Sequence, residues 1–150
     1  MIMWVLVIIL VALDQATKYI AHHLVAPDGS VRLLPFLNIV NLDNPGAAFG
    51  TLQHVGNLFF IIISAVAILV VAVILAKSPK NKKPIGLVLV LSGAAGNLID
   101  RLALGHVRDF IDVHAGSHHW PAFNFADSYL SIGIILLLIS SFLQTKGGQD

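Results

Sequence analysis

Long apolar stretches alternate with short polar ones along the chain. Four stretches reach the roughly 20 apolar residues that cross a hydrocarbon layer of about 30 Å, namely residues 2–21, 55–76, 85–104 and 126–144. The second stretch is apolar on all sides, which is typical of a helix that faces lipid. The third contains small residues from Ser92 to Gly96, which allow another helix to approach closely. The pattern predicts an all-α integral membrane protein with a bundle of four transmembrane helices.

The lysines indicate how these helices are oriented. Five of the six lysines follow the second and fourth apolar stretches, at Lys77, Lys80, Lys82, Lys83 and Lys146. Because short loops rich in Lys and Arg remain in the cytoplasm, we predict that both termini are cytoplasmic. The connections over residues 22–54 and 105–125 then lie on the outer face. Neither a basic leader nor a small-residue cleavage site accompanies the first stretch, which we therefore interpret as a retained helix.

Composition supports this interpretation and excludes some kinds of site. The chain has 150 residues, of which 57% are hydrophobic and 11% charged, with a net charge of +1 that does not point to nucleic acid. Little chain is left for a separate soluble domain, so we predict one membrane-embedded domain over residues 1–150. The sequence contains neither cysteine nor glutamate. Disulfides, thiolate chemistry and an HExxH zinc peptidase are therefore excluded.

The outer connections contain two segments with strand-like patterns. LNIVNL, residues 37–42, precedes a turn signal at Asn44-Pro45-Gly46. In VRDFIDV, residues 107–113, every second side chain falls in one row that is mostly aliphatic. On an extended strand Asp109 shares one face with aliphatic residues, whereas Asp112 lies on the other face. We expect burial to raise the pKa of Asp109 and expect Asp112 to face solvent. The alternative is that Asp109 is an ordinary surface acid paired with Arg108. The sequence predicts a small extramembrane β-structure on the outer face.

Charged and amide side chains also occur within the predicted helices. Asp14 and Lys18 are four residues apart, in the order that suits an ion pair on a helix. We interpret them as a structural clamp, with a direct chemical role as the alternative. Asn97, Asp100 and Arg101 share one helix face at i, i+3 and i+4. We expect Asn97 and Arg101 to hold Asp100 ionised, as a structural anchor rather than a proton carrier.

Asp127 stands near the start of the fourth stretch, three residues after Asn124. Asn124 would cap the helix and Asp127 would interact favourably with its dipole, which is a sufficient structural explanation. A functional explanation is also open, if the preceding loop brings Asp109 to the same rim. Two carboxylates that share a proton could hydrolyse an amide. One would take a proton from water while the other, protonated, polarised the carbonyl.

Several of the polar residues considered above lie in five short segments: DQATK (14–18), NPGAAF (44–49), GAAGNLIDR (93–101), VRDF (107–110) and FNFAD (123–127). In this order they resemble the motifs of bacterial lipoprotein signal peptidase, or signal peptidase II. The resemblance covers nearly the whole chain and includes four spans of the expected topology. The fold of that family is a four-helix membrane bundle with a small outer β-structure, in agreement with the pattern above.

The resemblance implies an aspartic peptidase of the bacterial cytoplasmic membrane that needs neither metal nor cofactor. Its substrates would be prolipoproteins, cut just before a cysteine that carries diacylglycerol, and its other partner would be membrane lipid. It implies catalysis by Asp109 and Asp127 at the outer, periplasmic face. It also implies that further residues bind substrate or support the site: Asp14, Lys18, Asn44, Asn97, Asp100, Arg101 and Asn124.

Two positions depart from the family pattern. Ser92 stands where the family often has glycine, a change between small residues that should preserve close packing. Arg108 precedes the first implied catalytic aspartate, where an aliphatic residue is common. We expect the positive charge of Arg108 to oppose the rise in the pKa of Asp109.

Other functions are compatible with parts of the pattern. A small membrane transporter would also keep charges within its helices, although transporters usually hold them at the middle of the membrane. A noncatalytic membrane assembly protein would tolerate loss of either aspartate. A metal site could use His114, His118 and His119, but no accompanying acid or cysteine pattern supports one.

Overall fold

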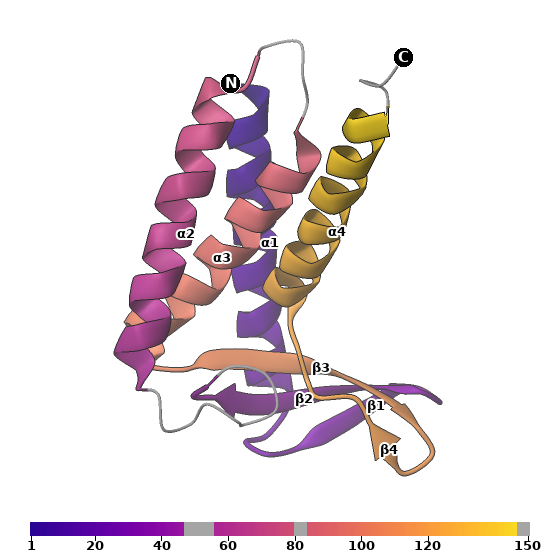
Figure 1. The fold of residues 1–150 in the computed structure, drawn as a ribbon. Coiled ribbons are helices and arrows are strands. Elements are labelled where there is room, and N and C mark those ends of the chain that lie inside the picture. The colour runs from indigo at the N-terminus through magenta and orange to yellow at the C-terminus, as the bar shows by residue number, and fades with distance from the viewer. Residues whose placement is uncertain (47–55, 80–83, 147–150) are drawn as a thin grey trace.

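A computed structural model describes residues 1–46, 56–79 and 84–146 of the chain. In these ranges it contains four long helices and an antiparallel sheet that lies across one end of them (Figure 1). The helices are α1 (Ile2–Leu24), α2 (Asn57–Lys77), α3 (Ile85–Leu104) and α4 (Phe125–Lys146). Each is long and apolar enough to cross a membrane. The predicted four-helix architecture is confirmed, with boundaries close to the predicted ones.

Some of the predictions concern residues outside these ranges. Lys80, Lys82 and Lys83, which contributed to the predicted topology, are among them, as is the second half of the segment 44–49. The start of α1, the end of α2 and the start of α3 lie at the end of the bundle opposite the sheet (Figure 1).

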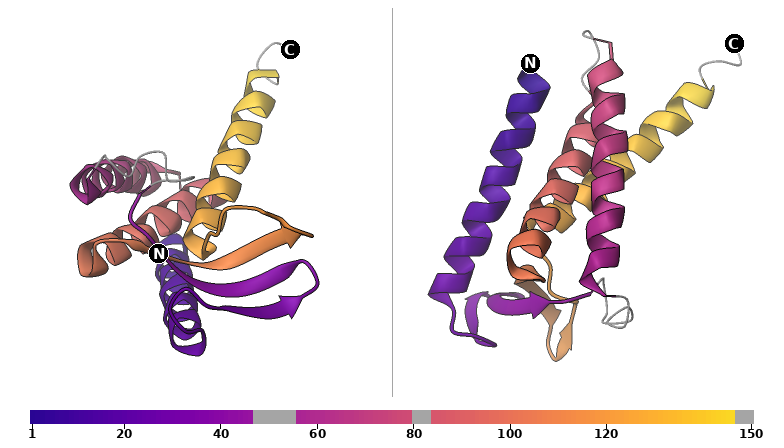
Figure 2. Two further views of the ribbon diagram at one scale, coloured as in Figure 1. Left: turned by 90° about the horizontal axis from the view of Figure 1, so that it is seen from below. Right: turned by 90° about the vertical axis from the view of Figure 1, so that its left-hand side faces the viewer.

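Helix α3 is the centre of the bundle, because it contacts α1, α2 and α4. A Cβ atom at Gly93 would collide with the carbonyl oxygen of Ala126 on α4, so glycine is what permits this close approach. Ser92 is fully buried and donates its hydroxyl to the Val88 carbonyl at 2.7 Å. The predicted packing surface of small residues is therefore confirmed. Helix α4 diverges from the other helices toward its C-terminal end (Figure 2).

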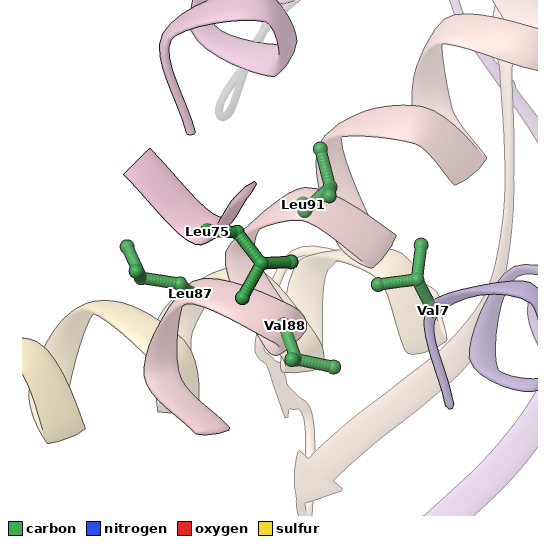
Figure 3. Close-up of a cluster of buried hydrophobic side chains, with 5 residues drawn as sticks. All are labelled: Val7, Leu75, Leu87, Val88 and Leu91. Carbon is green, nitrogen blue, oxygen red and sulfur yellow. The ribbon is translucent and has the colours of Figure 1, made fainter. Parts of the chain in front are cut away.

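A small apolar cluster joins three of the helices at the end away from the sheet. Figure 3 shows its members, Val7 from α1, Leu75 from α2, and Leu87, Val88 and Leu91 from α3. Most of the other apolar side chains on α2 are exposed, as the prediction of a lipid-facing helix requires. The helices therefore present apolar surface outward, which suits a lipid surround.

The sheet consists of β1 (Ser30–Leu34), β2 (Leu37–Asn44), β3 (Val107–Ala115) and β4 (His118–His119), in that order. Strands at residues 37–42 and 107–113 were predicted and are confirmed, whereas β1 and β4 were not predicted. Gly105 ends α3 in the left-handed conformation, with φ of 85°, which glycine adopts without steric cost. This turn directs the chain from the end of α3 into β3.

After β4 the chain folds back beside β3 before it enters α4. Phe123 pairs with Ile111, with backbone N–H donors at 3.0 and 2.8 Å from the opposing carbonyl oxygens. The four residues that follow this bridge include Asn124 and Asp127. The bridge therefore brings the first turn of α4 next to the first half of β3, where Asp109 lies.

Candidate active site

Asp109 lies on β3 and is 4% exposed. Asn124 donates to one of its carboxylate oxygens at 2.7 Å, and Asn44 donates to the other at 2.9 Å. Asn44 is the last residue of β2, and its side-chain oxygen accepts the N–H of Gly46 at 3.1 Å. Two amide side chains from different elements thus fix the orientation of this carboxylate. The predicted burial of Asp109 is confirmed.

Asp127 lies in the first turn of α4, and its carboxylate is tied to the same asparagine. The Asp127 N–H donates to the Asn124 side-chain oxygen at 3.0 Å, and the Asn124 N–H donates to Asp127 Oδ2 at 3.2 Å. This reciprocal pattern is a helix N-cap, so the predicted capping role of Asn124 is confirmed. Asn97 on α3 donates to Asp127 Oδ1 at 2.8 Å. Asp127 is thereby fixed by both α3 and the segment before α4.

One residue, Asn124, connects the two carboxylates through its side chain and its backbone N–H. Asn124 is fully buried, and it donates to Asp109 while its backbone N–H donates to Asp127. Both aspartates line a cavity of about 750 Å³, together with Asn44, Asn97 and Arg101. The structure therefore brings together the two carboxylates whose proximity the sequence alone left open.

Burial and the nearby charge of Asp127 raise the pKa of Asp109 to about 6, against opposing hydrogen bonds from Asn44 and Asn124. An acid near this pKa can carry a proton at mildly acidic to neutral pH, as a general acid must. Arg108 had been expected to oppose this rise. That expectation is wrong, because the guanidinium of Arg108 bonds to Asp100 instead and leaves Asp109 to its buried surroundings.

This shift of the Asp109 pKa predicts a pH-dependent stability. Its ordinary value is 3.8, so the protonated acid is favoured in the folded protein, and stability should fall as pH rises from about 4 to about 6. Asp109→Asn is neutral throughout that window. The free energy of unfolding of the variant minus that of wild type should therefore increase by about 2–3 kcal/mol from pH 4 to pH 7. Unfolding in detergent micelles at both pH values measures this, and a difference independent of pH would contradict it.

A buried group of charged side chains contacts Asn97 through Lys18. Lys18 Nζ lies 2.8 Å from Asp14 Oδ2, 3.4 Å from Asp100 Oδ2 and 3.0 Å from the side-chain oxygen of Asn97. Asp14, Lys18 and Asp100 are 0% exposed. The predicted pair of Asp14 and Lys18 is confirmed as a structural clamp, and Lys18 also orients the amide that holds Asp127.

Asp14 also reaches the fourth helix. Its Oδ1 atom accepts the backbone N–H of Ala126 at 2.9 Å, one of the N–H groups at a helix start that lack a partner within the helix. The clamp on α1 therefore fixes the first turn of α4, which carries Asp127.

The partners of Asp100 differ from those predicted. Arg108 donates from Nη2 to Asp100 Oδ1 at 2.7 Å, and Lys18 contacts Oδ2 at 3.4 Å, whereas Arg101 and Asn97 were expected to hold this carboxylate. The reason is that β3 folds back over the end of α3 and brings Arg108 to Asp100. Asp100 is an anchor, as predicted, but it ties α3 to β3 and α1.

The side chain of Arg101 faces Phe60 on α2 and the cavity. Its guanidinium carbon lies 5.1 Å from the ring centre of Phe60 on α2, in cation–π range, and its side chain lines the cavity. A cation at this position can interact with a carbonyl oxygen or a developing negative charge. The expected role of Arg101 in substrate binding is compatible with this position and stays a prediction.

Asp112 is not the solvent-facing residue that the alternation predicted. It is 7% exposed, and it accepts hydrogen bonds from Asn38 at 2.8 Å and from His119 at 2.9 Å. Burial raises its pKa, but the bonds from Asn38 and His119 outweigh that effect and lower it overall. The side chains of Asn38 on β2 and His119 on β4 contact this carboxylate, and β4 was not predicted.

The outer histidines have other partners. His119 bonds to Asp112, and its ring stacks on that of His114 with centroids 4.9 Å apart. In the part of the chain that the structure describes, no group of three His or Asp side chains is arranged to hold a metal ion.

Sequence reasoning missed two contributors to the site. Gln15 lies within the first motif but was not singled out, and it links α1 to the Gly96 carbonyl on α3 at 3.0 Å. Helix α2 was interpreted only as a lipid-facing span, yet Ile63, Ser64 and Ala67 line the cavity. The signal for α2 was the group of small side chains at Ser64, Ala65 and Ala67, next to bulky apolar residues.

The comparisons with known proteins agree on one family. Residues 6–143 match the family model described as "Signal peptidase (SPase) II". The lipoprotein signal peptidase of Thermodesulfovibrio yellowstonii is 46% identical over 132 residues, which are 88% of each chain. That of Acinetobacter baumannii is 44% identical over 145 residues, with 93% of this chain and 82% of the relative covered.

A solved structure supports the same assignment. It is described as a bacterial membrane enzyme determined by the in meso method at 2.3 Å, and it superposes with a TM-score of 0.87 at 35% identity. The match covers 97% of this chain and 90% of the other. By sequence and by fold, the chain belongs to the signal peptidase II family.

Proposed function

We propose that the protein is a membrane aspartic endopeptidase that removes the signal peptide from diacylglyceryl-modified prolipoproteins, cutting just before the lipidated cysteine. The observation that carries the proposal is the joint orientation of Asp109 and Asp127 by Asn124 on one cavity. The relatives named above are lipoprotein signal peptidases, which identifies the class of substrate.

The proposed chemistry uses the two carboxylates as a pair. The ionised member takes a proton from water, whose oxygen adds to the scissile carbonyl carbon, while the protonated member donates a hydrogen bond to the carbonyl oxygen. The C–N bond then breaks, and the leaving nitrogen receives a proton from the pair. Because the two acids titrate together, the shared proton belongs to the dyad rather than to either residue.

The surrounding amides have separate tasks in this proposal. Asn44, Asn97 and Asn124 hold the carboxylates in position, and Arg101 supplies a cation beside the cavity. Preorganised donors of this kind cost little rearrangement during the reaction. Asp14, Lys18 and Asp100 support the site without touching the substrate.

The shape of the bundle supports entry of the substrate from the side. Among the described residues, α2 and α4 pack against α3 and not against each other. The cavity lies between them, with Ile63 and Ala67 on α2 and Leu130 and Ile132 on α4 among its lining residues. An apolar signal segment could lie in this gap while the acyl chains of the modified cysteine remain in lipid.

We also propose the orientation of the protein in the bacterial cytoplasmic membrane. The sheet and the dyad would face the periplasm, and both termini the cytoplasm. The exposed Lys77 ends α2 at the end of the bundle opposite the sheet, in agreement with the positive-inside rule. Asp109 and Asp127 belong to the sheet end of the bundle rather than to its middle, which favours a peptidase at the interface over a transporter.

Substrate selectivity tests the proposed function. We expect the purified protein in detergent micelles to cleave a diacylglyceryl-modified prolipoprotein, and to leave the same precursor with an unmodified cysteine uncut. Mass spectrometry of the products identifies the bond that is broken. Cleavage of both precursors at equal rates would contradict the selectivity, and cleavage of neither would contradict the proposed function.

A further inference from the structure

Arg108 connects three elements of the fold with a single side chain. It follows Val107 and precedes Asp109 on β3, and its guanidinium contacts α3 and α1, whereas Asp109 and Asp127 line the cavity. Its Nη2 atom lies 2.7 Å from Asp100 Oδ1 on α3 and 3.1 Å from Gln15 Oε1 on α1. Its backbone N–H also donates to Asp100 Oδ2 at 3.1 Å. The strand that carries Asp109 is thus attached to both helices immediately next to that residue.

The Gln15 contact extends this attachment. The side-chain N–H₂ group of Gln15 donates to the Gly96 carbonyl at 3.0 Å and to Asp14 Oδ2 at 3.2 Å. The side-chain oxygen of Gln15 therefore accepts a hydrogen bond from Arg108, while its side-chain nitrogen donates to acceptors on α3 and α1. A rigid partner of this kind restricts where the guanidinium can lie.

Arg108 also affects the second aspartate, through Lys18. An ammonium group has three N–H donors, and Lys18 has three acceptors within reach, on Asp14, Asn97 and Asp100. Because Arg108 bonds to both oxygens of Asp100, Lys18 can remain closer to Asn97, at 3.0 Å, than to Asp100, at 3.4 Å. Asn97 in turn donates to Asp127.

The charges of this cluster balance. Asp14 and Asp100 carry negative charge, and Lys18 and Arg108 carry positive charge. The side chains of Asp14, Asp100 and Lys18 are 0% exposed, and that of Arg108 is 15% exposed. Buried charges are stable only when they are paired and hydrogen-bonded. Without Arg108, two carboxylates would compete for Lys18, and the ammonium would be drawn from Asn97 toward Asp100.

We propose that Arg108 is a positioning residue for the peptidase reaction. It fixes Asp109 through the strand and Asp127 through the series Asp100, Lys18 and Asn97, so that the two carboxylates stay aligned. This inference rests on the proposed function, because alignment of the dyad matters only if the dyad is catalytic. Arg108 does not touch the substrate.

Two substitutions of Arg108 test the inference. Arg108→Met keeps a long apolar stem but removes the charge and the fork of donors, and we expect kcat to fall by about 10- to 100-fold with KM changed less than about twofold. Arg108→Lys can pair with Asp100 but cannot also hold Gln15 in fork geometry. It should restore kcat to within about threefold of wild type. Arg32→Met on the exposed strand β1 is the matched control and should match wild type.

Activity is expressed per folded molecule, with the folded fraction measured by gel filtration and thermal unfolding in micelles. A folded Arg108→Met protein with wild-type kcat would overturn the inference. A loss of kcat in Arg108→Met that Arg108→Lys does not restore would also overturn it. So would a loss that is proportional to the folded fraction, because a purely structural role predicts that result. If wild type itself does not cleave the lipidated precursor, the proposed function fails instead.

Discussion

Asp109→Asn and Asp127→Asn are each expected to lower the rate of prolipoprotein cleavage by at least about 10³-fold. Each substitution leaves an amide that can still hydrogen-bond to Asn124 but can neither take a proton from water nor donate one as an acid. The proposed mechanism needs one carboxylate and one carboxylic acid, so loss of either should stop it. The rate is measured under single-turnover conditions with a lipidated precursor.

The matched control is Asp28→Asn, because Asp28 is exposed and lies in the turn that precedes β1. Its φ of 53° is left-handed, a conformation that asparagine tolerates well, so the variant should keep the wild-type rate. Asp112→Asn would be a weaker control, since Asp112 is buried and bonded to Asn38 and His119. Full activity in either dyad variant would refute the assignment of the dyad.

Lys18→Met is expected to lower the free energy of unfolding by about 3–5 kcal/mol. Lys18 is fully buried and contacts Asp14 and Asp100, so its removal leaves two buried carboxylates with one remaining cation, Arg108. The substitution also removes the donor that orients Asn97 toward Asp127. Cleavage should therefore be lost even under conditions where the protein remains folded.

Denaturant unfolding in detergent micelles, followed by circular dichroism, measures the effect of Lys18→Met. The matched control is Lys77→Met, which removes an exposed lysine at the end of α2 and should change stability by less than about 0.5 kcal/mol. Equal stability of the two variants would mean that the buried pair with Asp14 does not stabilise the fold.

The sequence predicted the helices and two strands well because their patterns are local. A run of about twenty apolar residues predicts a transmembrane helix. The alternating aliphatic residues around Asp109 predict a strand with one buried face. The cap formed by Asn124 could also be predicted, since it depends on residues three apart. Likewise, the pair of Asp14 and Lys18 lies within one helical turn.

The contacts that were not predicted join elements that are distant in sequence. Arg101 was expected to hold Asp100 because it is adjacent, but the partner is Arg108 from β3, and no local pattern encodes that pairing. Asp112 was expected to be exposed because nothing in the sequence indicated that β4 would cover it. The proximity of Asp109 and Asp127 depends on the bridge between Ile111 and Phe123, which is also tertiary.

The central claim is that Asp109 and Asp127 together hydrolyse one bond of a lipidated precursor. The most direct measurement is quantitative mass spectrometry of that precursor over time with wild type, Asp109→Asn and Asp127→Asn at equal folded concentration. We predict that wild type releases the mature chain beginning with the modified cysteine, and that both variants leave the precursor intact. Release of the same product at the wild-type rate by either variant would contradict the claim.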